Sequence, residues 1–356
     1  MERQTWLSFS EPPAALSTER ADFRIRLSRG EQFDLFMEAG VEGGETPGRD
    51  RWRVAALQAR LAMRAKRRRG ATVRGAHSPR FNQWLDQSRA DVALLTTDLP
   101  TGPYPYAGVP WFSTPFGRDG IITAWQMLWL DPSLARGVLT YLAARQADET
   151  STFQDSAPGK IMHETRQGEM SALKEVPFGL YYGGVDTTCL FVALAGAYAR
   201  RTGDLAFIRK IWPNLLAAAG WMTDHGDSNG DGLIDYARAE DTGLSNQGWK
   251  DSEDSIFHAD GAYPKGPIAL LEVQATPIPP GGRWPTCRPC WERGARRRGA
   301  TAPSACARWW RTVSGWRIGG STPSPWMGRA RRAGCWAPTR GTCCSAACLR
   351  RSGPDG

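Results

Sequence analysis

The spacing of apolar and polar residues changes along the chain. Near the start, three short segments alternate apolar and polar side chains with Pro and Gly between them. This period of two predicts strands over residues 6–10, 22–27 and 32–36. Three short strands do not readily close a core of their own. We therefore interpret residues 1–46 as the C-terminal remnant of a β-sandwich domain.

Residues 47–79 are interpreted as a linker that contains a helix. The pattern predicts the helix over residues 51–69, where Lys66-Arg67-Arg68-Arg69 is followed by Gly70. Cations favour the negative end of the helix macrodipole, and glycine commonly ends a helix. A solvated helix end explains this basic run better than a nucleic-acid contact does.

From residue 80 onward the apolar residues recur at helical spacing. The predicted helices cover residues 81–97, 121–130, 132–146, 187–201, 205–225 and, as the start of a sixth, 265–274. Long connections over 98–117 and 147–184 occur at alternate junctions. Short turns at one end and long loops at the other are expected of a barrel of paired helices. The chain is therefore predicted to be mainly α, with residues 80–274 as the first half of a barrel.

The last part of the chain has an unusual composition. Residues 275–356 contain 15 arginines, no lysine and two acidic residues, whereas residues 1–274 carry 30 basic and 34 acidic side chains. Seven of the eight cysteines and seven of the sixteen tryptophans also lie there. A basic nucleic-acid arm would use lysine, and a zinc module built on Cys287-x-x-Cys290 would need a second ligand pair. We favour translation out of frame, with a disordered tail, so the net charge of +9 indicates no nucleic-acid partner.

The remaining features of the body suit a cytoplasmic protein. Cys189 stands in an apolar helical run, as expected of a core thiol in a reducing compartment. No apolar run follows the first residues as in a signal peptide, and no stretch of eighteen apolar residues predicts a membrane span.

Two long connections carry side chains that suit a sugar-binding cleft. In the first, aromatic residues that include Trp111 and Phe112 precede Arg118-Asp119 at the start of a helix. Aromatic faces stack on sugar rings, and an Arg–Asp pair can hold neighbouring hydroxyl groups. Asp119 could instead simply cap the helix, which would leave the aromatic residues without a role.

The second connection is polar. His163, Glu164 and Arg166 do not have the spacing of a zinc-binding helix, so we expect no metal there. A polar wall of the cleft and a solvated loop both remain open as interpretations. Asp186 opens the next helix after Tyr181-Tyr182, either as a cap or as part of the same wall.

A third connection contains two candidate features. Residues 227–235 resemble the first nine positions of a calcium-binding EF-hand loop, but position twelve is Arg238, where that loop has glutamate. A tight turn rich in Asp, Asn and Gly is the favoured interpretation. Further on, Asp251 follows Trp249 and Lys250. An apolar ring raises the pKa of a neighbouring carboxyl, as a general acid requires, whereas lysine lowers it.

Four motifs occur in order: Phe116-Gly117-Arg118-Asp119; Gly159-Lys160-Ile161 with His163-Glu164 and Arg166; Tyr181-Tyr182-Gly183 with Asp186; and Gly248-Trp249-Lys250-Asp251-Ser252. In this order and at these distances, residues 80–274, and more weakly 5–45, resemble the bacterial amylo-α-1,6-glucosidase family of glycogen-debranching-type glycoside hydrolases.

The resemblance implies an (α/α)6 barrel behind an N-terminal β-sandwich, and inverting hydrolysis of α-glucosidic bonds in an oligosaccharide or glycogen-like glucan. It casts Asp251 as the general acid and implies no cofactor or metal. The expected substrate-binding residues are Trp111, Phe112, Arg118, Asp119, His163, Glu164, Arg166, Tyr182, Asp186 and Trp249.

An inverting mechanism also needs a catalytic base, about 6.5–9.5 Å from the acid. In this family the base comes late in the barrel, where this chain offers only Glu292 and Asp355. We therefore expect a truncated copy with little activity and an exposed apolar edge that aggregates. The alternatives are another inverting (α/α)6 hydrolase for trehalose-like or mannosyl substrates, and a non-catalytic carbohydrate-binding remnant. A nucleic-acid binder acting through the tail is the remote alternative.

Overall fold

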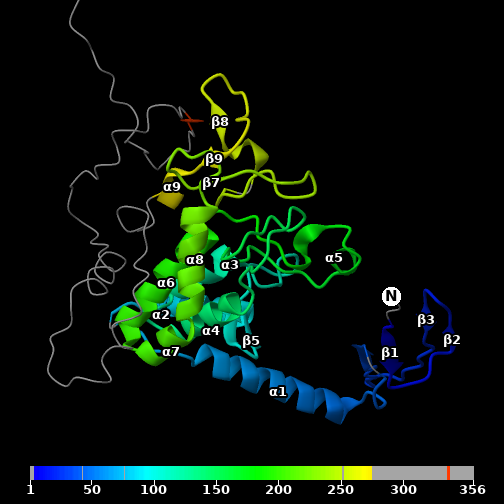
Figure 1. Ribbon diagram of the computed structural model, residues 1–356. Coiled ribbons are helices and arrows are strands. Elements are labelled where there is room, and N and C mark those ends of the chain that lie inside the picture. The colour runs from blue at the N-terminus through cyan, green and yellow to red at the C-terminus, as the bar shows by residue number, and fades with distance from the viewer. Residues whose placement is uncertain (1–3, 42, 76, 251, 275–334, 337–356) are drawn as a thin grey trace, which may run out of the picture. The chain divides into compact units, whose positions relative to one another are not determined.

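A computed structural model describes residues 4–41, 43–75, 77–250, 252–274 and 335–336 (Figure 1). This part of the chain is mainly helical, which confirms the predicted class, and its strands form small two-stranded antiparallel sheets. The chain divides into two compact units, Met1–Leu94 and Leu95–Gly356. Each unit is described by itself.

The first unit begins with two small sheets. In one, β1 (Trp6–Phe9) pairs with β4 (Met37–Gly40); in the other, β2 (Ala15–Leu16) pairs with β3 (Ala21–Asp22). The strand predicted over 6–10 is confirmed. The strands predicted over 22–27 and 32–36 are wrong, since residues 23–36 form none. Ile25 and Leu27 remain 47% and 56% exposed, so the alternating pattern there has no partner strand and no core to face.

The unit continues into two helices, α1 (Arg49–Arg67) and α2 (Pro79–Leu95). Both were predicted, and the basic last turn of α1 agrees with the macrodipole argument. The Arg89 guanidinium donates to the carbonyls of Arg67 and Ala71 at 2.8 and 2.7 Å, and so satisfies backbone acceptors at and beyond the end of α1.

The second unit contains most of the buried core. Its longer helices are α3 (Gly117–Gln126), α4 (Pro132–Ala143), α6 (Thr187–Thr202) and α8 (Trp212–Asp224), with the short α7 (Leu205–Lys210) between the last two. A single helix over 205–225 was predicted and is wrong. The chain breaks at Ile211, because Pro213 has no amide hydrogen and suits only the first turn of a new helix.

Helix α6 is the centre of this unit, and α3, α4 and α8 pack against it. Twelve of its sixteen residues are buried, including Phe191 and Leu194. A helix that is apolar on nearly all sides is stable only inside a core. Figure 1 shows the four helices together, with β7, β8 and β9 beyond the C-terminal end of α8.

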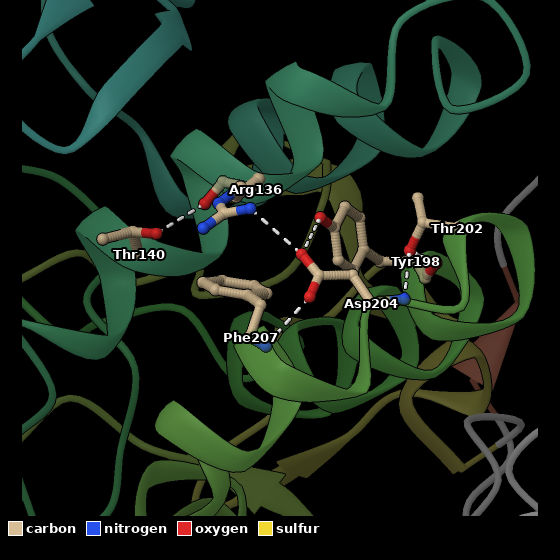
Figure 2. A network of polar contacts seen from close by, with 6 residues as sticks. All are labelled: Arg136, Thr140, Tyr198, Thr202, Asp204 and Phe207. Carbon is tan, nitrogen blue, oxygen red and sulfur yellow. Dashed lines mark hydrogen bonds and ion pairs between the residues drawn. The ribbon is translucent and has the colours of Figure 1, made fainter.

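A polar network ties α4 to the junction of α6 and α7 (Figure 2). Asp204 caps α7 by accepting from the Phe207 amide at 3.1 Å, and its other oxygen accepts from Arg136 and from the Tyr198 hydroxyl, both at 3.0 Å. The Arg136 guanidinium also lies 5.1 Å from the centre of the Phe207 ring. This carboxylate therefore joins three helices where α6 ends at Gly203, whose φ of 70° suits glycine.

The connection predicted as a loop over 98–117 contains a hairpin. β5 (Thr96–Leu99) pairs with β6 (Gly102–Pro105), and the hairpin packs on α4. An added Cβ at Gly137 would lie 2.1 Å from the Pro103 carbonyl oxygen, so the contact requires glycine at that place in α4. Alternation over only four residues left this hairpin unrecognised.

The remaining elements belong to the long connections. They are α5 (Glu169–Ala172), the 3-10 turns η1 (Pro177–Gly179) and η2 (Glu253–Ser255), the strands β7 (Asp235–Tyr236), β8 (Phe257–His258), β9 (Ile268–Ala269) and β10 (Cys335–Trp336), and α9 (Leu271–Gln274).

β7 pairs with β9, and β8 with β10. The helix predicted over 265–274 is therefore wrong for its first half. Gly266 adopts φ 85° and a proline follows it, so a helix can begin only later.

Candidate functional site

Arg118 and Asp186 form a buried ion pair at the centre of the predicted site. Arg118 lies in the first turn of α3, and Asp186 directly precedes α6. Arg118 Nε lies 2.7 Å from Asp186 Oδ2, and Nη2 donates to the Gln247 carbonyl at 3.1 Å. The Asp186 side chain makes no capping hydrogen bond, so its partner is the arginine rather than the helix.

The backbone of the second connection lies against the start of α3. The Gly117 amide donates to the His163 carbonyl at 2.6 Å, and the His163 amide donates to the Tyr181 carbonyl at 2.7 Å. Glu164 forms backbone bridges to both Phe116 and Tyr181. The first three predicted motifs therefore lie side by side, although residues 117 and 181 are far apart in sequence.

Glu164 and Arg166 form a second ion pair, with 2.5 Å between Oε2 and Nε. Glu164 is 3% exposed, and this burial raises the pKa of its carboxyl, while Arg166 acts in the opposite direction. The Arg166 guanidinium lies 5.8 Å from the ring centres of both Phe112 and Phe116. The charge is thus held on an aromatic surface.

His163 is held in its neutral form. Burial, followed by the nearby charges of Arg118, Lys160 and Arg166, lowers the pKa of the imidazole to about 3. Its Nδ1 atom is buried and has no hydrogen-bond partner among the described residues. A neutral imidazole nitrogen can either donate or accept, depending on the tautomer.

Two further buried polar atoms, both at the start of α6, also lack partners within the described part of the chain. They are Asp186 Oδ1 and Thr187 Oγ1. An added Cβ at Gly184 would lie 2.7 Å from Thr187 Oγ1 and 2.9 Å from His163 Nδ1, so both atoms lie beside the same glycine. Buried polar atoms without partners are unusual, because each costs about 1–3 kcal/mol. Arg118, His163, Glu164, Arg166, Asp186 and Thr187 are called the Arg118 site below.

The predicted aromatic residues divide into two groups. Trp111, Trp249 and Phe112 are 81%, 51% and 50% exposed, so their rings can meet a ligand. Tyr182 is 4% exposed, and its hydroxyl donates to the Arg145 carbonyl at 2.9 Å. The hydroxyl of Tyr182 is therefore engaged within the protein. Asp119 is exposed and contributes to raising the pKa of Glu164, which places it near the site.

The candidate general acid, Asp251, lies outside the described residues, but its two neighbours in sequence are described. The Asn246 side-chain amide donates to the carbonyls of Lys250 and Ser252, the second at 3.1 Å. Asn246 Oδ1 accepts from the Tyr236 hydroxyl at 3.0 Å. Sequence reasoning missed Asn246, which lies five residues before position 251 in an otherwise ordinary polar run.

A second residue that sequence reasoning missed is Asp155. Its Oδ2 accepts from the Tyr181 hydroxyl at 2.7 Å and from Gln247 Nε2 at 3.0 Å, and its Oδ1 accepts from the Ala239 amide at 2.8 Å. Its backbone has φ 52°, which is uncommon for a residue other than glycine. Gln247, which also accepts from Arg118, connects this carboxylate to the Arg118 site.

The segment that resembles a calcium loop is a tight turn. Asp227 accepts from the amides of Gly230 and Gly232, each at 2.7 Å, and Asp235 accepts from the Ser228 amide at 3.2 Å. These carboxylates thus satisfy the loop's own backbone. Within the described ranges, no group of three His, Cys, Asp or Glu side chains is placed to hold a metal ion.

The chain matches no protein-family model and no curated protein sequence. In the portion of the chain that is described, no helix combines the length and the apolar character that crossing a bilayer would need.

Proposed function

We propose that the Arg118 site binds one sugar ring of an α-linked glucan. The proposal includes the partial (α/α)6 barrel that the four motifs imply, and a place among glycogen-debranching-type α-glucosidases. The observation that carries it is that two buried polar atoms without partners among the described residues, His163 Nδ1 and Thr187 Oγ1, lie beside the same glycine within the cluster of predicted residues. A sugar hydroxyl both donates and accepts, so it can satisfy a buried hydroxyl and a neutral imidazole together.

The charges around these atoms favour a neutral polyol over an ionic ligand. Arg118 is paired with Asp186, and Arg166 with Glu164. Each charge is therefore already compensated, and an added phosphate or carboxylate would meet an acidic partner beside each arginine. The exposed rings of Trp111, Phe112 and Trp249 supply stacking surfaces for further sugar units. A glycan, rather than a nucleic acid, is accordingly the proposed partner.

Catalysis would require carboxylates other than those of Glu164 and Asp186, which both belong to ion pairs. Glu164 and Asp186 each lie beside an arginine, so both carboxylates already have a partner within the protein. In the proposed hydrolysis Asp251 protonates the leaving oxygen, and a separate carboxylate activates water. The pairing of Glu164 and Asp186 with arginines favours the second candidate, a carbohydrate-binding remnant that does not turn over its ligand. Cys189 is a buried free thiol, which supports a cytoplasmic location.

Two neighbouring threonines allow a sharp test of binding. Thr187 and Thr188 are both fully buried, but among the described residues only the Thr188 hydroxyl has a partner, accepting from the Ile161 amide at 3.0 Å. Thr187→Val keeps the shape and removes a hydroxyl that has no hydrogen bond to the described part of the chain. We expect it to leave the free energy of unfolding unchanged or higher, while weakening maltotriose binding about tenfold. Thr188→Val should lower stability by about 1–3 kcal/mol and retain the affinity.

Titration calorimetry of the full chain with maltotriose, panose, trehalose and α-mannobiose measures this directly. Heat with the α-glucans alone supports the debranching assignment, whereas preference for trehalose or mannobiose supports the alternative hydrolases. Glucose release from panose separates an enzyme from a binding remnant. Absence of binding to all four sugars, or equal affinity of the Thr187→Val variant, overturns the proposal.

A further inference from the structure

We infer that Asp155 is a positioning residue that couples the order of segment 239–247 to ligand binding at the Arg118 site. The identity of the ligand rests on the proposed function. The positioning role of Asp155 in segment 239–247 rests on the contacts alone. Asp155 belongs to none of the motifs that carry the resemblance. Its side chain does not contact the Arg118 site directly and acts through Gln247.

The connection begins at the Asp155 carboxylate, which receives three hydrogen bonds from two distant segments. The donors are Ala239 and Gln247 on one side and Tyr181 on the other. Asp155 is 8% exposed, Gln247 1% and Tyr181 fully buried. In such surroundings each lost bond leaves a donor without water to replace the acceptor.

The Tyr181 hydroxyl extends the connection. It donates to Asp155 and accepts from the Leu244 amide at 2.7 Å. Burial and the hydrogen bond to Asp155 both raise the pKa of this phenol, so it stays protonated and able to donate. Segment 239–247 is thereby held at Ala239, Leu244 and Gln247, three places along its length.

Gln247 then carries the connection into the site. Its side chain donates to Asp155, while its backbone carbonyl accepts from Arg118 at 3.1 Å and from the Val185 amide at 3.1 Å. Val185 directly precedes Asp186, the partner of Arg118. Displacement of Gln247 therefore removes a hydrogen bond from each side of the Arg118–Asp186 pair.

The backbone of Asp155 is fixed as well. The Lys160 ammonium donates to the Asp155 carbonyl at 2.8 Å, and the φ of 52° places the residue in the left-handed region. Residues other than glycine seldom adopt that conformation, although aspartate does so more often than most. The network of bonds around the carboxylate offsets this strain, as expected where the structure holds one side chain in a required place.

Asparagine at this position changes the hydrogen bonding of the side chain without changing its size. Asp155→Asn keeps size and shape, but one of its two terminal atoms becomes a donor. That atom must face either the Ala239 amide or the Tyr181 hydroxyl and the Gln247 amide, all of which donate. The matched control is Asp241→Asn in the same segment, because the Asp241 side chain is 95% exposed and forms a surface ion pair with Arg238.

Hydrogen exchange without ligand tests whether Asp155 holds segment 239–247 in place. In the Asp155→Asn full chain we expect faster exchange at the amides of Ala239, Leu244 and Val185, whose acceptors belong to this network. Exchange within α4 should stay unchanged, as should all amides in Asp241→Asn. Equal acceleration in α4 would make Asp155 a contributor to global stability only and would overturn the inference, as would unchanged exchange at the three amides.

Calorimetry with maltotriose tests the coupling. Because coupling is reciprocal, ligand should slow exchange at Leu244 in the unmodified chain, and Asp155→Asn should weaken binding about five- to tenfold. Faster exchange in segment 239–247 with unchanged affinity for maltotriose would contradict the coupling. If the unmodified chain does not bind maltotriose, the proposed function and the coupling that rests on it both fail, while the exchange data without ligand still decide the positioning role.

A second variant covers the case in which Asp155→Asn does not fold. Tyr181→Phe removes only the hydroxyl between Asp155 and Leu244, and leaves Gln247 bonded to the carboxylate. It should accelerate exchange at Leu244 more than at Val185. Equal acceleration at both amides, or none at Leu244, contradicts the proposed order of contacts.

Discussion

Arg118 and Asp186 stand 68 positions apart and meet through a 2.7 Å contact that joins the start of α3 to the start of α6. Their side chains are 8% and 11% exposed. In such a pair each charge depends on the other, because neither is adequately solvated. The contact therefore holds two core helices together, while the other carboxylate oxygen, Asp186 Oδ1, has no hydrogen-bond partner among the described residues.

Removal of one partner should be costly. Asp186→Ala leaves the Arg118 charge buried without its carboxylate, and we expect a loss of about 3–5 kcal/mol in the free energy of unfolding. The exposed pair of Arg238 and Asp241 is the control, and Asp241→Ala should cost less than about 1 kcal/mol. Urea unfolding measures both. Similar small losses for the two variants would show that the buried pair does not contribute to stability.

Close packing at Gly117 supports a second prediction. An added Cβ would lie 2.2 Å from the Met162 carbonyl oxygen and 2.5 Å from Thr187 Cγ2. Gly117→Ala must push α3 away from residues 162–163, and should lower the free energy of unfolding by about 3 kcal/mol. Gly168→Ala is the matched control, since no atom lies within 4 Å and φ is −66°. Thermal unfolding of both variants provides the comparison, and equal midpoints would contradict the tight contact.

The sequence predicted the parts of the fold that depend on local pattern. Helices α3, α4 and α6 have helical apolar spacing, and Asp131 caps α4 ahead of Pro132, so their positions could be anticipated within a few residues. Alternation over 22–27 failed for the opposite reason. A strand needs a neighbour for its backbone, and the pattern of one segment does not show whether a neighbour exists.

The site was predictable only in part. Arg118, His163 and Asp186 belong to short motifs whose order suggested a common place. Asp155 and Gln247 could not be found in this way, because their partners lie as far as 92 positions apart and each stands in a polar loop without periodicity. Their importance comes from the contacts that folding creates.

His163 should make stability depend on pH. Its folded pKa of about 3 lies below its ordinary value of 6.5, so the unfolded state binds the proton first as the pH falls through that window. Stability is then lost on acidification, by about 2 kcal/mol between pH 7 and pH 5. His163→Gln should remove this part of the dependence, whereas His225→Gln, at an exposed position, should keep it. Parallel urea midpoints for His163→Gln and the unmodified chain would contradict the prediction.

Lys160 should act in the alkaline range. Burial lowers the pKa of its ammonium to about 8 from 10.5, although the charge of Asp155 opposes the change. Between these values the unfolded state holds a proton that the folded state has released, so stability rises with pH. The unmodified chain should gain about 2 kcal/mol relative to Lys160→Met between pH 8 and pH 10.

The methionine variant is the right reference because it keeps a long apolar side chain beside Trp221, whose ring lies 5.6 Å from the ammonium. This variant also loses the bond to the Asp155 carbonyl at every pH. The difference in the free energy of unfolding at pH 7 alone therefore does not show whether Lys160 has released its proton. The change in that difference with pH isolates the proton. A constant difference from pH 7 to pH 10 would mean that Lys160 releases no proton in the folded chain over this range, and that solvent reaches the ammonium.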